Sequence, residues 1–226
     1  AEKKGLDILV TCSTCLVNML KAKRKLDSDD VLRDRVNGNL KKEGLAYKGE
    51  ADVKHILWIL VNDIAEIEKR VVTRVNAEIA PYYGCHILRP SKILGFESSH
   101  NPRSIDKIIN VCGANVVEFD SKKDCCGFHS VAVNERPSMK MGAKVLIDAK
   151  MQGADALVVV CPFCHASLDA YQPESLSMMG KRFQLPVLHL TQFIGMALGI
   201  PNTELGLEKN IIKADHIVMG TERLRF

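Results

Sequence analysis

A short apolar strand followed by a Cys-x-x-Cys motif occurs twice in this chain, and this repeat constrains the fold more than any other feature. The segments ILVTCSTCLVNML (8–20) and VVVCPFCHASL (158–168) both place the motif directly after apolar residues. The match begins earlier, with Gly-x-Asp-x-Leu-Val in both copies. Two unrelated strand-to-helix turns could look alike, but the shared cysteines argue against that alternative. We therefore expect two copies of one unit.

The second copy has companion cysteines that the first copy lacks. The chain has eight cysteines, and Cys85 and the Cys125-Cys126-Gly127 triplet precede the second motif. Only eleven residues precede Cys12 in the first copy. If the copies are true repeats, an equivalent cysteine and Cys-Cys-Gly would stand upstream of residue 1. We therefore expect a longer parent protein, of which the first copy is truncated here.

The apolar pattern predicts strands and helices in alternation, which is typical of an α/β fold with mostly parallel sheets flanked by helices. We expect residues 1–76 to be the C-terminal remainder of a first domain plus linking helices, and residues 77–226 to be a second, complete domain. One long amphipathic helix is predicted over 53–76, with its apolar stripe in the core. Part of that stripe could instead be a docking face for a partner. Predicted strands cover 5–11, 78–85, 115–120, 155–161 and 185–190.

Most cysteines lie where a predicted strand ends. In open α/β sheets, ligands bind outside the carboxyl ends of the strands, so one crevice can collect these thiols. Soft thiolates favour zinc, Cu(I) or iron–sulfur clusters. A single zinc ion or a cubane cluster needs about four ligands, and adjacent cysteines fit one tetrahedral ion poorly. The pattern therefore indicates a polynuclear cluster, and a disulfide framework is disfavoured because the chain is large and shows no secretory signal.

Charge and hydropathy exclude other classes. The net charge is +4, and the densest basic run, KAKRK at 21–25, is followed at once by DSDD at 27–30. That pairing favours a solvated surface over a nucleic-acid groove. No apolar stretch reaches the roughly 18 residues that a membrane span needs. We expect a cytoplasmic protein without a membrane span and without a nucleic-acid partner.

The cysteine pattern resembles a known family. Cys85, Cys125-Cys126-Gly127 and Cys161-Pro162-Phe163-Cys164 resemble the cysteine-rich CCG domain, which occurs twice in the B subunit of heterodisulfide reductase. It also occurs in iron–sulfur subunits of lactate, glycolate and some succinate oxidoreductases. The resemblance covers nearly the whole chain and is most specific in its second half.

The resemblance implies a noncubane [4Fe-4S] cluster held by all the cysteines of a domain. One site would be complete and one partial, and the two sites would face a small-molecule disulfide between them. The complete site would comprise Cys85, Cys125, Cys126, Cys161 and Cys164, while Cys12 and Cys15 would be the surviving ligands of the other.

The same resemblance implies a function, which is reduction of the coenzyme M–coenzyme B heterodisulfide of methanogenesis. Electrons would arrive from a ferredoxin-like C subunit and a flavin-containing A subunit, since the chain has no nucleotide-binding glycine fingerprint. His86 is the candidate catalytic acid, because it follows a ligand cysteine and has a suitable ordinary pKa. Arg89 and Lys92 are candidates for binding an anionic substrate, with surface solvation as the alternative.

Two other functions stay open. One is an iron–sulfur subunit of a lactate, glycolate or succinate:quinone oxidoreductase, and the other is a zinc-stabilised binding module without redox chemistry. His129 and His165 neighbour ligand cysteines and are expected to be helix caps or to hydrogen-bond the cluster site. Cys112 has no place in the pattern and is expected to be a core residue.

Overall fold

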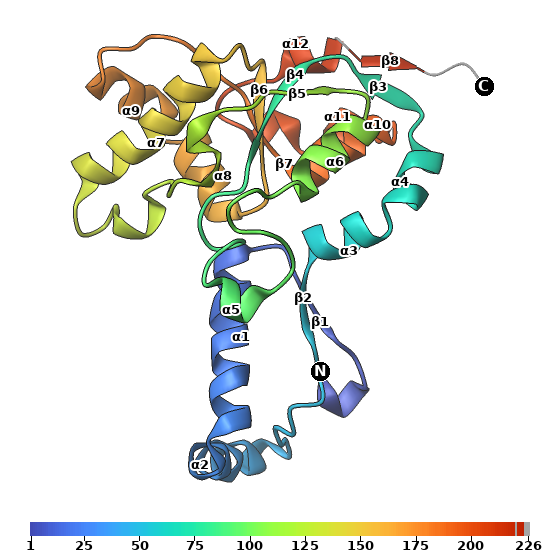
Figure 1. The fold of residues 1–226 in the computed structure, drawn as a ribbon, viewed down its shortest axis with the longest axis vertical. Helices are drawn as coiled ribbons and strands as arrows, with labels where there is room; N and C mark the ends of the chain where they lie inside the picture. The colour runs from blue at the N-terminus through green and yellow to red at the C-terminus, as the bar shows by residue number, and fades with distance from the viewer. Residues whose placement is uncertain (220, 224–226) are drawn as a thin grey trace.

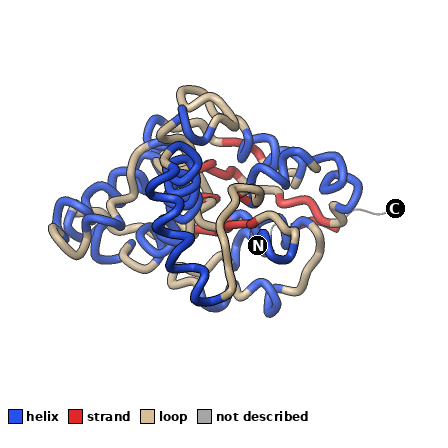
Figure 2. Tube along the Cα trace, turned by 90° about the horizontal axis from the view of Figure 1, so that it is seen from below, coloured by secondary structure: helices blue, strands red, loops and turns tan. Residues whose placement is uncertain are grey.

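The computed structural model describes residues 1–219 and 221–223, in which helices surround short, mostly parallel strands (Figures 1 and 2). The strands are β1 Ile8–Val10, β2 Val53–His55, β3 Thr73–Val75, β4 Glu78–Tyr82, β5 Asn115–Val116, β6 Ala156–Val159, β7 Val187–His189 and β8 Thr221–Arg223. The α-helices are α1 Ser13–Ser28, α2 Asp30–Leu40, α3 Ile56–Asn62, α4 Ile64–Arg70, α5 Ser91–Leu94, α6 Ser104–Val111, α7 Glu135–Met151, α8 Pro162–Asp169, α9 Gln172–Met178, α10 Leu190–Ala197, α11 Asn202–Leu205 and α12 Asp215–Met219. The predicted α/β class with parallel sheets flanked by helices is confirmed.

The largest sheet has the strand order β5-β4-β6-β7, and all of its pairs are parallel. Side chains alternate between its faces. Val158 and Leu188 belong to a core cluster with α6 and α10, whereas Leu157 and Val187 belong to a second cluster with α7, α8 and α9. Figure 1 shows these two groups of helices on opposite sides of the sheet. Burial on both faces explains the unbroken apolar run of β6.

A smaller parallel sheet pairs β1 with β2. Helix α1 follows β1 and packs on β2, and Leu16 and Val17 of α1 join the core cluster that also contains α6 and α10. The two ends of the sequence therefore share one core. In the described part of the chain, β1 pairs with no strand besides β2.

The prediction of one long helix over 53–76 is wrong. The segment comprises β2, then α3 and α4 with a break at Asp63, and then β3. Val53 is drawn into the parallel pair with Ile8, where a β-branched side chain packs well. Val71 adopts an extended backbone and ends α4. The prediction that the apolar stripe lies in the core holds in part. Ile67, Val71 and Val75 are buried, whereas the other members are only half-buried, namely Ile56, Ile59, Leu60 and Ile64.

The sequence repeat has a local counterpart in the structure. We define the first unit as residues 8–62 (β1, α1, α2, β2 and α3) and the second unit as residues 156–197 (β6, α8, α9, β7 and α10). Cys12 and Cys161 are the N-cap residues of α1 and α8, with φ/ψ of −128°/118° and −134°/125°. In both units a parallel strand then ends in a histidine that caps the next helix. The division into two domains at residue 76 stays a prediction.

Candidate functional site

A small cavity at the carboxyl ends of β4 and β6 brings the predicted cluster ligands together. Cys85 follows β4, Cys125 and Cys126 lie on the loop after β5, and Cys161 and Cys164 stand at the start of α8. All five line one cavity, together with Ser13, Thr14, Tyr83, His86, His129 and Phe163. This is the edge of the sheet at which the sequence placed the site.

Two glycines allow the backbone to approach these thiols. Gly127 has φ +83°, and a Cβ there would lie 2.2 Å from the Ser138 carbonyl oxygen of α7. Gly84 has φ +66°, and a Cβ there would lie 3.3 Å from Cys164 Sγ. Both positions therefore need glycine, for conformation and for space. The glycine of Cys-Cys-Gly is explained by packing against α7.

The thiols contact one another in a line, from Cys85 to Cys125, Cys126, Cys164 and Cys161. Hydrogen bonds from Cys126 and Cys85 lower the pKa of Cys125 to about 2, and a hydrogen bond from Cys164 lowers that of Cys161 to about 4. The thiols that donate are correspondingly harder to ionise, since hydrogen bonding to Cys125 raises the pKa of Cys85 and Cys126. Some of these cysteines can therefore ionise to thiolates, and the thiolate is the form that binds metal.

The first unit contributes to this same site. Cys12 Sγ lies 4.0 Å from Cys161 Sγ, although the two residues are 149 positions apart. Burial raises the pKa of Cys12 to about 12. The backbone N–H groups of Thr14, Phe163 and Cys164 donate toward Cys161, so the N-termini of α1 and α8 converge here. Cys15, the other predicted ligand of the first unit, is exposed and lies outside the cavity lining.

Thr14 connects two histidines across the cavity. Its Oγ1 is 2.9 Å from His86 Nδ1 and 2.9 Å from His129 Nε2. A hydroxyl has one proton to donate, so at least one of these ring nitrogens must donate to it. Burial, followed by the neighbouring His129, lowers the pKa of His86. Sequence reasoning identified His86 but missed Thr14. The one sequence feature that could have pointed to Thr14 is that it is a polar residue between the two cysteines of the first motif.

The other predicted site residues lie elsewhere. Arg89 and Lys92 line a separate depression together with Pro90, Ser91, Ser99, His100 and Lys123. Arg89 Nη2 donates to the Lys123 carbonyl oxygen at 3.2 Å. His165 Nε2 donates to the Val187 carbonyl oxygen at 3.0 Å, which is neither the helix cap nor the hydrogen bond to the cluster site that was expected. Cys112 is fully buried in the core, as expected.

The donor set fits an iron–sulfur cluster better than a single ion. Within residues 1–219 and 221–223, no three His, Cys, Asp or Glu side chains are grouped so as to hold one metal ion. The thiols are instead spread in a line around one cavity, and Gly84 leaves room beside Cys164. Sulfur-only donors in this number suit a group with several iron atoms. Cys85, Cys125, Cys126, Cys161 and Cys164 are the residues that would hold it.

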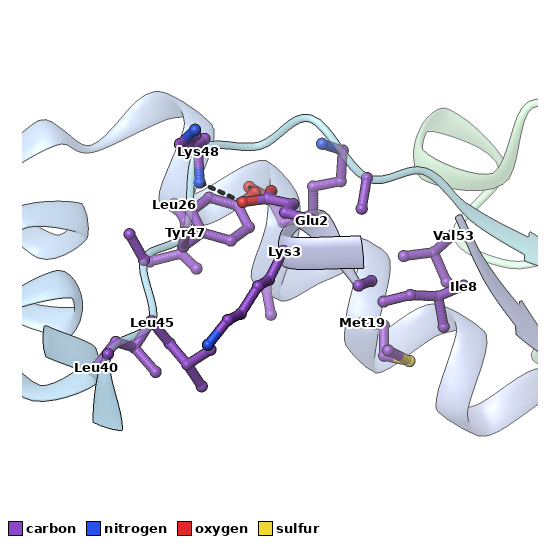
Figure 3. Close-up of a pocket in the computed structure, with 16 residues that line it drawn as sticks. Glu2, Lys3, Ile8, Met19, Leu26, Leu40, Leu45, Tyr47, Lys48 and Val53 are labelled. Atoms are coloured by element: carbon purple, nitrogen blue, oxygen red, sulfur yellow. Dashed lines mark hydrogen bonds between the residues drawn. The ribbon is translucent and has the colours of Figure 1, made fainter. Parts of the chain in front are cut away.

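A larger, mainly apolar cavity of about 540 Å³ lies beside α1, between the first unit and residues 1–3 (Figure 3). Its walls include Ile8, Met19, Leu26 and Tyr47. The Glu2 carboxylate accepts backbone N–H groups from Lys48, Gly49 and Glu50 at its edge. No cysteine or histidine lines it, so it is not part of the thiol site.

Comparisons with known proteins agree with the cysteine pattern. Residues 79–169 match the family described as Cysteine-rich domain (CCG). The 8-methylmenaquinol:fumarate reductase membrane anchor subunit of Wolinella succinogenes is 42% identical over 95% of this chain and 75% of its own length. The B subunit of a ferredoxin/F420H2-dependent CoB-CoM heterodisulfide reductase from Methanosarcina acetivorans is 32% identical over 94% of this chain and 72% of its own length.

A solved structure shares the fold. The crystal structure of a hypothetical protein from Helicobacter pylori has a TM-score of 0.66 at 20% identity and covers 87% of this chain. This chain spans only 36% of that longer protein, so the likeness concerns the fold alone.

The predicted set of partners is wrong. A ferredoxin-like C subunit and a flavin-containing A subunit were expected, with no membrane span, yet the Wolinella relative is named a membrane anchor subunit of a fumarate reductase. The error has a physical reason, because the cysteine motif specifies a metal site and carries no information about the surfaces that bind other subunits. Among the described residues, no helix has the length and apolar character to cross a membrane.

Proposed function

The chain belongs to the family of heterodisulfide reductase B subunits, whose members are oxidoreductase subunits, and from that premise we propose an electron-transfer function for it. It is the iron–sulfur subunit of a quinol:fumarate oxidoreductase and conducts electrons from a quinol toward fumarate. The observation that carries this proposal is the 42% identity to the Wolinella fumarate reductase subunit over 95% of the chain. The cluster would supply one-electron transfer when bound.

The residues of the cavity support this role. Five cysteines line the cavity, and hydrogen bonds lower the pKa values of two of them, Cys125 and Cys161. The N-termini of α1 and α8 direct backbone N–H groups at Cys161, where they favour negative charge. Phe163 stacks on Phe128 with ring centroids 4.6 Å apart and forms part of the cavity wall. Thr14 orients His86 at the open side, where a proton can be exchanged.

The cluster is tested by metal analysis of single-cysteine variants. Anaerobically prepared protein is expected to hold iron and acid-labile sulfide in equal amounts, and Cys126→Ser should lose most of both. Cys112→Ser is the matched control, because this buried thiol lies in the core outside the cavity and its loss should leave the iron content unchanged. Stoichiometric zinc without sulfide would instead support the zinc-stabilised module.

A second candidate function is reduction of the coenzyme M–coenzyme B heterodisulfide. The Methanosarcina acetivorans relative, at 32% identity, favours it by its name. Under this proposal His86 would protonate a leaving thiolate, and Arg89 and Lys92 would bind the anionic end of the substrate from their depression beside Cys85. The noncubane form of the cluster and a cytoplasmic location stay predictions.

The two functions are separated by the substrate that the assembled complex turns over. A menaquinol analogue should be oxidised with fumarate as acceptor, and Cys126→Ser should abolish that reaction. Viologen-dependent reduction of the heterodisulfide, with no oxidation of quinol, would overturn the first proposal and support the second. Arg89→Ala and Lys92→Ala should then raise KM for the heterodisulfide without changing the iron content.

A further inference from the structure

Two histidines that sequence reasoning did not select occupy equivalent positions in the two units. His55 ends β2 and caps α3, and His189 ends β7 and caps α10. The strand register is also the same, since His55 pairs with Val10 and His189 pairs with Val159. Val10 and Val159 each stand two residues before an N-cap cysteine. A histidine therefore lies beside each cysteine-bearing strand end.

Each of these histidines contacts the unit to which it does not belong. The His55 ring lies against the backbone carbonyl of Val160, the residue before Cys161, and interacts electrostatically with His189. The His189 ring lies against the backbone carbonyl of Thr11, the residue before Cys12. Each unit thus uses its histidine to contact the cysteine-bearing strand of the other unit. Cys12 and Cys161 meet between them, with 4.0 Å between the sulfur atoms.

Helix capping alone does not account for these side chains. Capping uses only Nδ1, which accepts the Leu57 N–H in one unit and the Thr191 N–H in the other. Serine, aspartate or asparagine caps a helix as well without burying an imidazole. His55 is fully buried, and Nε2 of both rings is buried without a hydrogen bond of good geometry to the described residues. A buried polar nitrogen costs free energy, so a second role for the ring is indicated.

We propose that His55 and His189 are reciprocal positioning residues: each ring fixes the cysteine-bearing strand end of the opposite unit, so that Cys12 and Cys161 face each other at the candidate cluster site. The proposed function explains why Cys12 and Cys161 would need to be held together. The histidine contacts themselves are made by the polypeptide without any metal, so this inference rests on the proposed function only for that explanation. The position of each cysteine should therefore depend on the histidine of the other unit. His55 controls Cys161, and His189 controls Cys12.

The test measures alkylation of each cysteine by iodoacetamide in the metal-free full chain, with peptide mass spectrometry. In His55→Asn and His189→Asn the shorter amide keeps the helix cap but cannot reach the opposite strand. His55→Asn is expected to speed alkylation of Cys161 about three- to tenfold, and His189→Asn that of Cys12, which corresponds to the loss of one polar contact. Cys125 and Cys126 should keep their rates. His→Gln, whose amide reaches the position of Nε2, should restore the slow alkylation of Cys161 and Cys12.

Other outcomes overturn the proposal. If each Asn variant accelerates only the cysteine of its own unit, or all cysteines equally, the histidines are ordinary caps. Unchanged rates in both Asn variants lead to the same conclusion. His216→Asn, at an exposed position of α12, is the control for replacing a histidine. His189 is only partly buried, so His189→Asn carries the test if His55→Asn does not fold. Because no metal is present, the result is independent of the iron analysis that tests the proposed function.

Discussion

The first and second units share a local plan but differ in their neighbours. Both place a cysteine at the N-cap of a helix after a short strand, and both return to a parallel strand that ends in a histidine. In the second unit, β6 is flanked by β4 and β7, whereas β1 of the first unit pairs with β2 alone within the described residues. Leu9 on β1 is 53% exposed, while Val158, its equivalent by register, is fully buried.

This difference shows that the repeated unit alone does not make a site. The second motif becomes a five-thiol cavity because β4 delivers Cys85 beside it and the loop after β5 delivers Cys125 and Cys126. The first motif has no such neighbour among residues 1–219, and of its two cysteines only Cys12 reaches the cavity, through Cys161. A Cys-x-x-Cys motif therefore contributes a pair of ligands, and the flanking strand decides whether they form a complete site.

The largest expected effect concerns Gly127, which has no counterpart in the first unit. Gly127→Ala should lower the free energy of unfolding by at least about 3 kcal/mol, because φ is +83° and the new Cβ meets a backbone carbonyl of α7. Gly5→Ala, three residues before the first unit, is the control, with φ +63° and open space, and should cost about 1 kcal/mol. Urea denaturation measures both. Equal losses would mean that contact with α7 is unimportant.

The next largest effect is a pH dependence of the free energy of unfolding, which is due to His55 where the two units meet. Burial, with a contribution from His189, lowers the pKa of His55 from 6.5 to about 4. In the unfolded chain the His55 side chain therefore becomes protonated near pH 6.5, whereas in the folded chain it becomes protonated only near pH 4. Stability is complete above pH 6.5 and should fall by about 3 kcal/mol as the pH drops to about 4. His55→Asn should flatten this slope in urea titrations between pH 7 and pH 4, and an unchanged slope would contradict the assignment.

A smaller effect compares equivalent strand positions. Val158→Ala should cost about 2 kcal/mol, since the side chain is fully buried between β6 and the helices α6 and α10. Leu9→Ala removes a larger side chain but should cost less than about 0.5 kcal/mol, because Leu9 is half exposed. Urea denaturation again gives the values. A large loss for Leu9→Ala would show that this face of β1 is covered in solution.

Much of the second unit could be predicted from the sequence, because its signals are local. The run of valines before Cys161, Gly153 at the end of α7 and the spacing of the cysteines each identify a strand, a helix end or a ligand. The prediction for segment 53–76 failed for a non-local reason. Its apolar spacing suits a helix, but pairing of Val53 with Ile8 overrides that preference, and such a pairing depends on residues 45 positions away.

The parts that could not be predicted are those in which the two units meet. Nothing in the sequence places Cys12 against Cys161, Thr14 against His129, or His55 against Val160, because each contact joins segments more than 70 residues apart. Arg89 and Lys92 were selected because the segment 84–97 resembles one in which basic residues lie near an anionic substrate. The turn after Cys85 and helix α5 carry them to a neighbouring depression instead.

The smallest expected effect concerns positions 14 and 163, which are equivalent in the two motifs. Thr14 hydrogen-bonds two histidines, whereas Phe163 stacks on Phe128. Thr14→Val keeps the shape but removes the hydroxyl, and should cost about 1 kcal/mol, or about 2–4 °C in Tm for a chain of this size. The loss of stability caused by Thr14→Val should largely disappear in a variant in which His86 and His129 are already replaced by Asn, because the Thr14 hydroxyl then no longer hydrogen-bonds either imidazole. If the cost is the same in both backgrounds, Thr14 acts only as a residue of α1, and the units are held together by the cysteine and histidine contacts alone.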